Sequence, residues 1–296
     1  MIEEIMIQSN ILALLALTFT LEYLTIGVPN FAHATIAFVS AYVALAIYLL
    51  GINVYIVLPI AFLASSFLNF SIYKLLSFLR RQKVSLVGLM ISTLAIDMII
   101  YSLMNIFADY LAYVLKAYTR SFTLRVADFT FGGLPGVIYV SSIICFGSII
   151  GWYFLLTKTK FGVSMRAIVE NYRLAKTLGI NTESVLGSAW FLIGGFIGLS
   201  GAIYPLWFSM NPWAGADMIV RILAASILGG LSNVYAAWVG GFLVGGIESL
   251  GIYYISSLIG SWFTPFRLLI PASVVFLTLG LMPEGIAGLI EKLRWR

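Results

Sequence analysis

The chain has 296 residues, of which 61% are hydrophobic and only 10% are charged, and its mean hydropathy is +1.03. Soluble domains carry about 25% charged residues, so this composition excludes a soluble globular protein and indicates an integral membrane protein. The net charge of +5 does not point to nucleic acid, because 12 of the 17 basic residues lie in three clusters, Lys74–Lys83, Lys158–Lys176 and Lys292–Arg296, as the positive-inside rule predicts for cytoplasmic segments.

The predicted elements, in chain order, are apolar segments separated by short polar stretches. A spanning helix needs about 20 apolar residues, and the run between Tyr23 and Tyr73 contains no charged residue at all. We predict an all-α fold, a polytopic membrane helical bundle of about 8–10 transmembrane elements. The segment at 218–231 is short enough to be broken or re-entrant. The predicted segments are 9–27, 31–50, 53–73, 84–107, 137–156, 184–209, 218–231, 236–258 and 266–282.

Two connections between these segments are long. An external loop is predicted at about 108–136, and a basic cytoplasmic loop at 157–183. With all three basic clusters inside, the parity of the spans places the acidic N-terminus outside a cell (inner) membrane and the C-terminus in the cytoplasm. No linker or internal repeat divides the chain, so residues 1–296 are expected to form a single transmembrane domain.

Glycines cluster in the second half of the chain. Gly194 with Gly198, and Gly241 with Gly245, have the spacing that lets helix backbones approach closely in lipid. We therefore expect dense helix packing around residues 184–209 and 236–258.

The stretch PNFAH after the first apolar segment breaks the helix at Pro29. Backbone groups freed at such a break must be satisfied by protein or water, so Asn30 and His33 are candidates for the translocation path or for a gate. A polar hinge bonded to its neighbours is an equal alternative. Glu22, near the inner end of the first span, receives no role.

Charged residues inside spans are costly and usually face a pore or a neighbouring helix. Asp97 and Glu248 are each near the middle of a predicted span and are candidates for the path, although pairing within the bundle is the alternative for both. Asn105, eight residues after Asp97, shares its helix face. Arg221, four residues after Asp217, is expected to form an interfacial pair near the outer surface.

Several chemical motifs are absent from the sequence. There is no GxxxxGK[ST] phosphate-binding loop, no HExxH, no GxSxG and no metal-spaced Cys/His cluster, and the chain has one histidine and one cysteine. We therefore expect neither a catalytic site nor a metal site, and no cofactor in this chain.

The insert SMRAIVENYRLAKTLGIN at 164–181 predicts a short amphipathic helix at the cytoplasmic mouth. One face carries Met165, Ile168, Tyr172, Ala175 and Leu178, and another carries Arg166, Glu170 and Arg173. Gly179 is expected to end this helix and Asn181 to cap the next one. Such a helix rests on lipid headgroups or docks a cytoplasmic partner, and an acid in the polar face favours a partner.

Four stretches, in order, resemble the branched-chain amino acid (LivH/LivM) type of ABC-importer permease. They are GVPNFAH at 27–33, KFGVSMRAIVENYRLAKTLGIN at 160–181, ILGGLSNVYAAWVGGFLVGGIES at 227–249 and LMPEGIAGL at 281–289. Two positions depart from the family pattern: Ala34 stands where the family commonly has Gly, and Tyr235–Ala236 replaces a usual Gly or Pro-Gly.

The resemblance implies one half of a membrane channel for branched-chain amino acids. It implies a second permease chain, in a homo- or heterodimer, together with two cytoplasmic ATPase subunits that use the ATP and an external solute-binding protein. Met165, Arg166, Ile168, Glu170, Tyr172 and Arg173 would then transmit ATPase closure to the spans. The alternatives are a permease for another small polar solute such as urea or another amide, an ATPase-independent channel or secondary transporter, and a non-transport scaffold.

Overall fold

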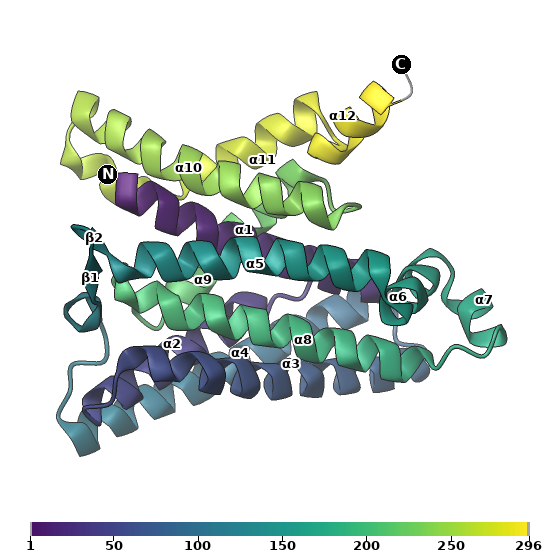
Figure 1. The fold of residues 1–296 in the computed structure, drawn as a ribbon, viewed down its shortest axis with the longest axis horizontal. Coiled ribbons are helices and arrows are strands. Elements are labelled where there is room, and N and C mark those ends of the chain that lie inside the picture. The colour runs from purple at the N-terminus through teal and green to yellow at the C-terminus, as the bar shows by residue number, and fades with distance from the viewer. Residues whose placement is uncertain (1, 295–296) are drawn as a thin grey trace.

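The structure, a computed structural model, describes residues 2–294, with side chains described for residues 2–289. Nine longer helices follow one another in this part of the chain, and the prediction of an all-α membrane bundle is confirmed (Figure 1). These helices are α1 (Ile2–Ile26), α2 (His33–Leu49), α3 (Val57–Arg81), α4 (Leu86–Leu115), α5 (Gly136–Lys158), α8 (Thr182–Ile203), α9 (Ala214–Gly229), α10 (Val234–Ile259) and α11 (Leu269–Leu281).

Shorter elements connect the long helices. Three further helices, α6 (Lys160–Glu170), α7 (Tyr172–Thr177) and α12 (Gly285–Arg294), lie at one end of the bundle, on the right in Figure 1. Short 3₁₀ turns occur at η1 (Val54–Ile56), η2 (Arg125–Ala127), η3 (Tyr204–Leu206) and η4 (Ser261–Phe266). At the opposite end, β1 (Thr130–Phe131) pairs antiparallel with β2 (Leu134–Pro135).

Each predicted span coincides with one of the nine helices, but the lengths differ. In the described residues seven helical segments are long and apolar enough to cross a membrane. By contrast, α2 has 17 residues and α9 has 16, so both are shorter than a full span. Helix α4 continues to Leu115, so the connection before α5 covers 116–135, which is shorter than the predicted loop at about 108–136.

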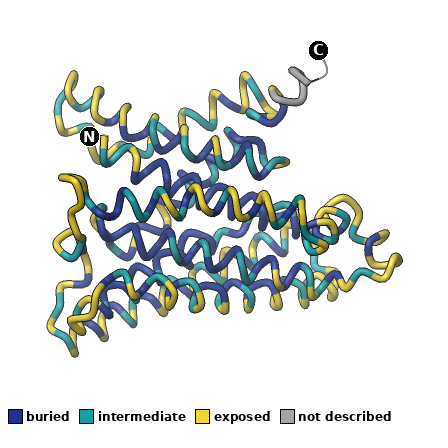
Figure 2. Tube along the Cα trace, in the orientation of Figure 1, coloured by how far each residue is buried: buried dark blue, intermediate teal, exposed yellow. Residues whose placement is uncertain are grey.

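Helix α1 forms the centre of the bundle. All of its residues from 7 to 22 are buried, and it packs against α10, α5, α8 and α9. Figure 2 shows this buried core, while the outer helices keep an exposed side. Exposed apolar side chains such as Met98 and Ile106 on α4 are expected of a surface that faces lipid rather than water.

The glycine pairs create the predicted close contacts. A Cβ atom built on Gly241 would lie 2.5 Å from the Cα atom of Ala13 on α1, and one on Gly245 would lie 2.6 Å from the Cα atom of Ser9. On α8, a Cβ atom at Gly198 would lie 2.3 Å from the carbonyl oxygen of Ala61 on α3. The expectation of dense packing in both segments is confirmed.

The connection between α4 and α5 is held across the ends of several helices. The Tyr55 hydroxyl donates to Asp128, and Phe122 pairs with Met210 through two backbone hydrogen bonds of 3.0 and 2.8 Å. The guanidinium of Arg125 lies 3.7 Å from the centre of the Trp207 ring. These contacts hold the loop against the helices at the end of the bundle opposite α7.

Candidate coupling and translocation sites

The basic insert consists of two helices, and the prediction of one continuous helix is wrong. The chain breaks at Asn171, whose backbone is extended (φ −150°, ψ 95°). The Asn171 side-chain oxygen accepts a hydrogen bond from the Leu174 N–H at 3.0 Å and so caps α7. Asparagine competes with helical hydrogen bonding in this way, which makes it a frequent first residue of a new helix.

Helix α6 folds back tightly against the end of α5. Thr159 caps it by accepting from the Gly162 N–H at 3.2 Å, and a Cβ atom at Gly162 would lie 2.3 Å from the Leu155 carbonyl oxygen. Met165 and Ile168 are buried, as predicted for the apolar face. Helix α6 is therefore fixed to the bundle by a small residue at the turn and by two apolar side chains.

Helix α7 lies farther out and is held by fewer side chains. Ala175 is buried, and Tyr172 stacks under the guanidinium of Arg80, with 5.1 Å from Cζ to the ring centre. Leu174 and Leu178 are 54% and 72% exposed, so Leu178 does not join the buried face that was predicted for it. In Figure 1, α7 stands beyond the ends of α3 and α8.

The end of the insert forms as predicted. Gly179 has a positive φ of 83°, which a glycine adopts without strain. The Asn181 side chain accepts from the Ser184 N–H at 3.1 Å and caps α8. Glu183, in the first turn of α8, forms an ion pair with Arg81 at the end of α3. The loop is thus connected on both sides to long helices.

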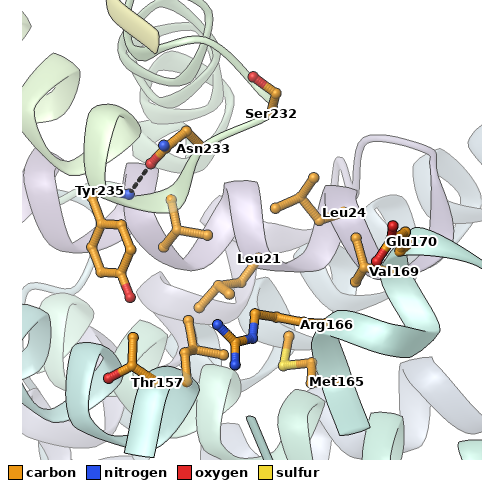
Figure 3. Close-up of a pocket in the computed structure, with 12 residues that line it drawn as sticks. Leu21, Leu24, Thr157, Met165, Arg166, Val169, Glu170, Ser232, Asn233 and Tyr235 are labelled. Atoms are coloured by element: carbon orange, nitrogen blue, oxygen red, sulfur yellow. Dashed lines mark hydrogen bonds between the residues drawn. The ribbon is translucent and has the colours of Figure 1, made fainter. Parts of the chain in front are cut away.

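A pocket of about 310 Å³ lies between α6, the C-terminal part of α1 and the turn before α10 (Figure 3). Arg166 extends into it beside Leu21, and Glu170 lies at its edge. No ion pair joins Arg166 to Glu170 in the described part of the chain. Glu170 also borders a second pocket, of about 590 Å³, whose lining includes the basic residues Arg80, Arg81, Arg173 and Lys176.

Asn30 and His33 meet a third side chain, Glu22, in a fully buried cluster. The Nδ1 atom of His33 lies 2.9 Å from Oε2 of Glu22, and the Asn30 amide donates to the same oxygen at 3.0 Å. Thr18 is hydrogen-bonded to Nε2 of His33 at 3.3 Å. Residues on both sides of the break at Pro29 thus share one polar cluster.

Glu248 holds two guanidinium groups. Its Oε1 atom accepts from Nε of Arg221 at 2.9 Å and from Nε of Arg267 at 2.7 Å, and Glu248 itself is fully buried. The prediction of an interfacial pair with Asp217 is wrong, because Arg221 is only 5% exposed and its partner is Glu248. The two arginines compensate the carboxylate, as a charge inside a span requires.

Asp97 and Asn105 belong to separate groups, although they share a helix face. Asp97 is half-buried and accepts from the Thr35 hydroxyl on α2. Asn105 accepts from Arg120 at 2.8 Å, and Arg120 also pairs with Asp109 at 2.6 Å, at the exposed end of α4. The structure therefore places Asp97 inside the α2–α4 contact and Asn105 beside the connection between α4 and α5.

Sequence reasoning missed the roles of Glu22 and Arg267. Glu22 lies 11 residues before His33, across a helix break, and Arg267 follows a 3₁₀ turn that joins two spans. The available signal was the rule that an ionisable side chain in a span needs a partner of opposite charge. That rule demands a partner but does not identify one.

Comparison with known proteins identifies the family of this multi-helix membrane protein. A family model described as the permease component of a branched-chain amino acid transport system matches residues 1–281. A probable branched-chain amino acid transport permease LivH of Methanocaldococcus jannaschii is 38% identical over 97% of this chain and 91% of its own length.

Two bacterial proteins are similar at lower identity. The high-affinity permease LivH of Salmonella typhimurium is 23% identical, and BraD of Pseudomonas aeruginosa is 24% identical, each over 93% of this chain and 91% of its own length. Members of this family are transport subunits of ABC importers, are not enzymes, and carry no cofactor of their own; ATPase and binding-protein partners complete such a system. The chain thus belongs to the branched-chain amino acid permease family and is a multi-pass membrane permease of an ABC import system for these amino acids.

Proposed function

We propose that α6 and α7 form the element on which cytoplasmic ATPase subunits dock, and that this chain provides one half of the transmembrane channel. A second permease chain completes the channel, two ATPase subunits hydrolyse the ATP, and an external binding protein delivers the amino acid. The end of the bundle that carries α7 then faces the cytoplasm, and the N-terminus lies outside.

The exposed apolar side chains of α7 carry this proposal. Leu174 on α7 and Leu178 directly after it are exposed, and α7 also exposes Arg173 and Lys176. A helix that rests on lipid turns its apolar face toward the membrane. In α7 the side facing the bundle is already occupied by Tyr172 and Ala175, so the exposed leucines favour a protein groove as their partner.

The contacts of the insert supply a route from the ATPase to the spans. A displacement of α7 acts on α3 through the Arg80–Tyr172 contact and on α8 through the 177–181 connection. The Arg81–Glu183 pair links these two helices to each other. Helix α6 carries the same displacement to α5 through its tight turn. Glu170, at the junction of α6 and α7, lies where both parts would move together.

For the translocation path we propose Thr35 on α2 and Asp97, which it contacts from α4. Asn30 and His33 anchor the break between α1 and α2, and a shift of this break changes the packing at the inner end of the path. In the outer half of the path we propose Glu248 together with its partners Arg221 and Arg267. Asn105 marks the outer mouth, beside the exposed Arg120.

Charge reversal at the junction of α6 and α7 tests the docking proposal. In the complete transporter we expect Glu170→Lys to reduce ATP-driven leucine uptake by a factor on the order of 5 to 150, the range of typical coupling energies. The ATPase subunits should continue to hydrolyse ATP, so that more ATP is used per leucine imported. Both rates are measured in proteoliposomes.

Asp217→Lys is the matched control, because Asp217 is also an exposed acid but lies at the start of α9, away from α7. This variant should keep the wild-type ratio of ATP hydrolysed to leucine imported. Unchanged uptake and an unchanged ratio in Glu170→Lys would overturn the docking role.

A further inference from the structure

At the end of the bundle opposite α7, a pocket of about 480 Å³ opens between the first turn of α1, the last turns of α10 and η4. Its size falls within the roughly 300–1,000 Å³ typical of small-molecule sites. Polar and charged side chains form much of its wall, which distinguishes it from the lipid-facing surface of the neighbouring helices. Under the proposed orientation, this pocket lies at the end of the bundle from which solute arrives.

Arg267 is the positively charged residue in the lining of this pocket. Its Nε atom is held at 2.7 Å by Oε1 of Glu248, which is fully buried and also binds Arg221. No other hydrogen bond or ion pair engages the Arg267 guanidinium within the described residues, so its terminal nitrogens remain available for a ligand. The side chain is 28% exposed and borders the pocket. Arginine presents such donors as a planar fork that matches a carboxylate.

The positive charge of Arg267 is well maintained. Burial lowers the pKa of its guanidinium, but the Glu248 carboxylate and its hydrogen bond raise it more, so the pKa lies above its ordinary value. The opposite charge comes from Glu4 in the first turn of α1, which lines the same pocket and adds to the upward shift. The pocket thus holds one cation and one anion that are not paired with each other.

Further polar groups complete the wall. The hydroxyls of Ser256 and Thr264 lie 3.4 Å apart across the α10–η4 turn. Ser249 is 4% exposed, and its hydroxyl has no hydrogen-bond partner among the described residues. A buried polar group without a partner is unfavourable, so a polar ligand or water that reaches this hydroxyl is stabilised. Ile252 and Tyr253 add an apolar part to the wall.

We propose that this pocket is an entry site for the zwitterion of an α-amino acid. The carboxylate binds the free nitrogens of Arg267, the ammonium binds Glu4, and the aliphatic side chain packs against Ile252 and Tyr253. Glu248 is a positioning residue, which fixes the arginine without touching the ligand. The inference rests on the proposed orientation and adds to it a specific binding site in this chain.

Photo-crosslinking tests the entry site. The complete transporter, without ATP, is illuminated with the diazirine analogue of leucine, and the labelled peptides are identified by mass spectrometry. We expect label on residues 249–267 that excess leucine removes. Arg267→Gln should reduce this label by about tenfold, as loss of a charge-assisted hydrogen bond predicts, while Arg267→Lys should retain part of it.

Glu4→Gln provides a second variant, because Glu4 is only partly buried at the start of α1 and is not needed for the Glu248 ion pairs. It should also weaken labelling. Ser273→Ala is the control: Ser273 is exposed on α11, bonds its own helix at Leu269, and should label normally. Isopentylamine and 4-methylpentanoate, which each lack one charge of the zwitterion, should compete less well than leucine.

Label at other segments only, or label on 249–267 that neither Arg267→Gln nor Glu4→Gln reduces, would overturn the entry site. These results are independent of the docking test, because labelling is measured without ATP. A transporter with intact ATP-driven uptake and no label here contradicts the entry site alone. Label here in a transporter whose uptake is insensitive to Glu170→Lys contradicts the docking proposal alone.

Discussion

Glu22 lies in α1, the most buried of the described spanning helices, and one of its carboxylate oxygens has two polar partners there. The carboxylate oxygen Oε2 accepts from the Asn30 amide and contacts Nδ1 of His33, at 3.0 and 2.9 Å. One turn farther along α1, the Thr25 hydroxyl accepts a buried hydrogen bond of 2.8 Å from the Trp190 ring on α8. Polar side chains thus join α1 to α2 and α8. Such hydrogen bonds fix how the helices are placed along one another, which apolar contacts alone specify less well.

Truncation of Glu22 tests how much this cluster contributes to the stability of the folded protein. We expect Glu22→Ala to destabilise the folded protein by about 2–6 kcal/mol, because it leaves the Asn30 amide and the His33 ring buried without this acceptor, at about 1–3 kcal/mol each. Glu22→Gln, which keeps a hydrogen-bonding oxygen, should cost less, about 1–3 kcal/mol. The unfolding temperatures in detergent rank the stabilities of these variants. Glu3→Gln, at the less buried start of α1, is the control, and equal losses for Ala and Gln at position 22 would contradict the account.

At the scale of the helix, close backbone contact through glycine is the main packing device. Gly201 on α8 lies against α2 so closely that a Cβ atom would be 1.7 Å from the carbonyl oxygen of Ala37. Gly151 on α5, in contrast, faces open space, with nothing within 4 Å of the same built atom. Both glycines lie within helices, but only at Gly201 does the neighbouring helix leave no room for a side chain.

Alanine substitutions at these two glycines can therefore be compared within the same protein. Gly201→Ala should force α2 and α8 apart and destabilise the protein by at least about 1–3 kcal/mol, the usual cost of overpacking. Gly151→Ala should be neutral or stabilise by up to about 1 kcal/mol, because alanine is the better helix former. Unfolding temperatures of the two variants measured side by side check the prediction. Equal behaviour at both positions would show that the α2–α8 contact is looser than described.

The helical elements were largely predictable from the sequence, because span length and hydropathy follow directly from the bilayer. The break at Asn171 was not, since an amphipathic repeat continues across it and only the capping geometry shows where one helix ends. The partners of Glu248 were equally hidden: Arg221 lies 27 residues before it and Arg267 lies 19 residues after it. Helical periodicity placed Asp97 and Asn105 on one face, but it carries no information on which helix lies opposite each.

For the whole molecule, the two ends have different chemistry. One end bears the α6–α7 insert with exposed leucines and basic residues, and the other bears the tied external connection and the pocket around Arg267. Helix α1 joins them through the centre of the bundle. This division fits the proposal that solute enters at one end and that ATPase subunits act at the other, since no phosphate-binding loop occurs in the sequence.

Uptake of radiolabelled leucine into proteoliposomes tests the central claim, that this chain forms a path which acts only when ATPase partners drive it. The account predicts no leucine accumulation with the purified chain alone, with or without ATP. Accumulation should occur when the second permease, the ATPase subunits and the binding protein are present and ATP is supplied on the side of α7. Leucine flux through the purified chain alone, or accumulation by the complete assembly without ATP, would contradict it.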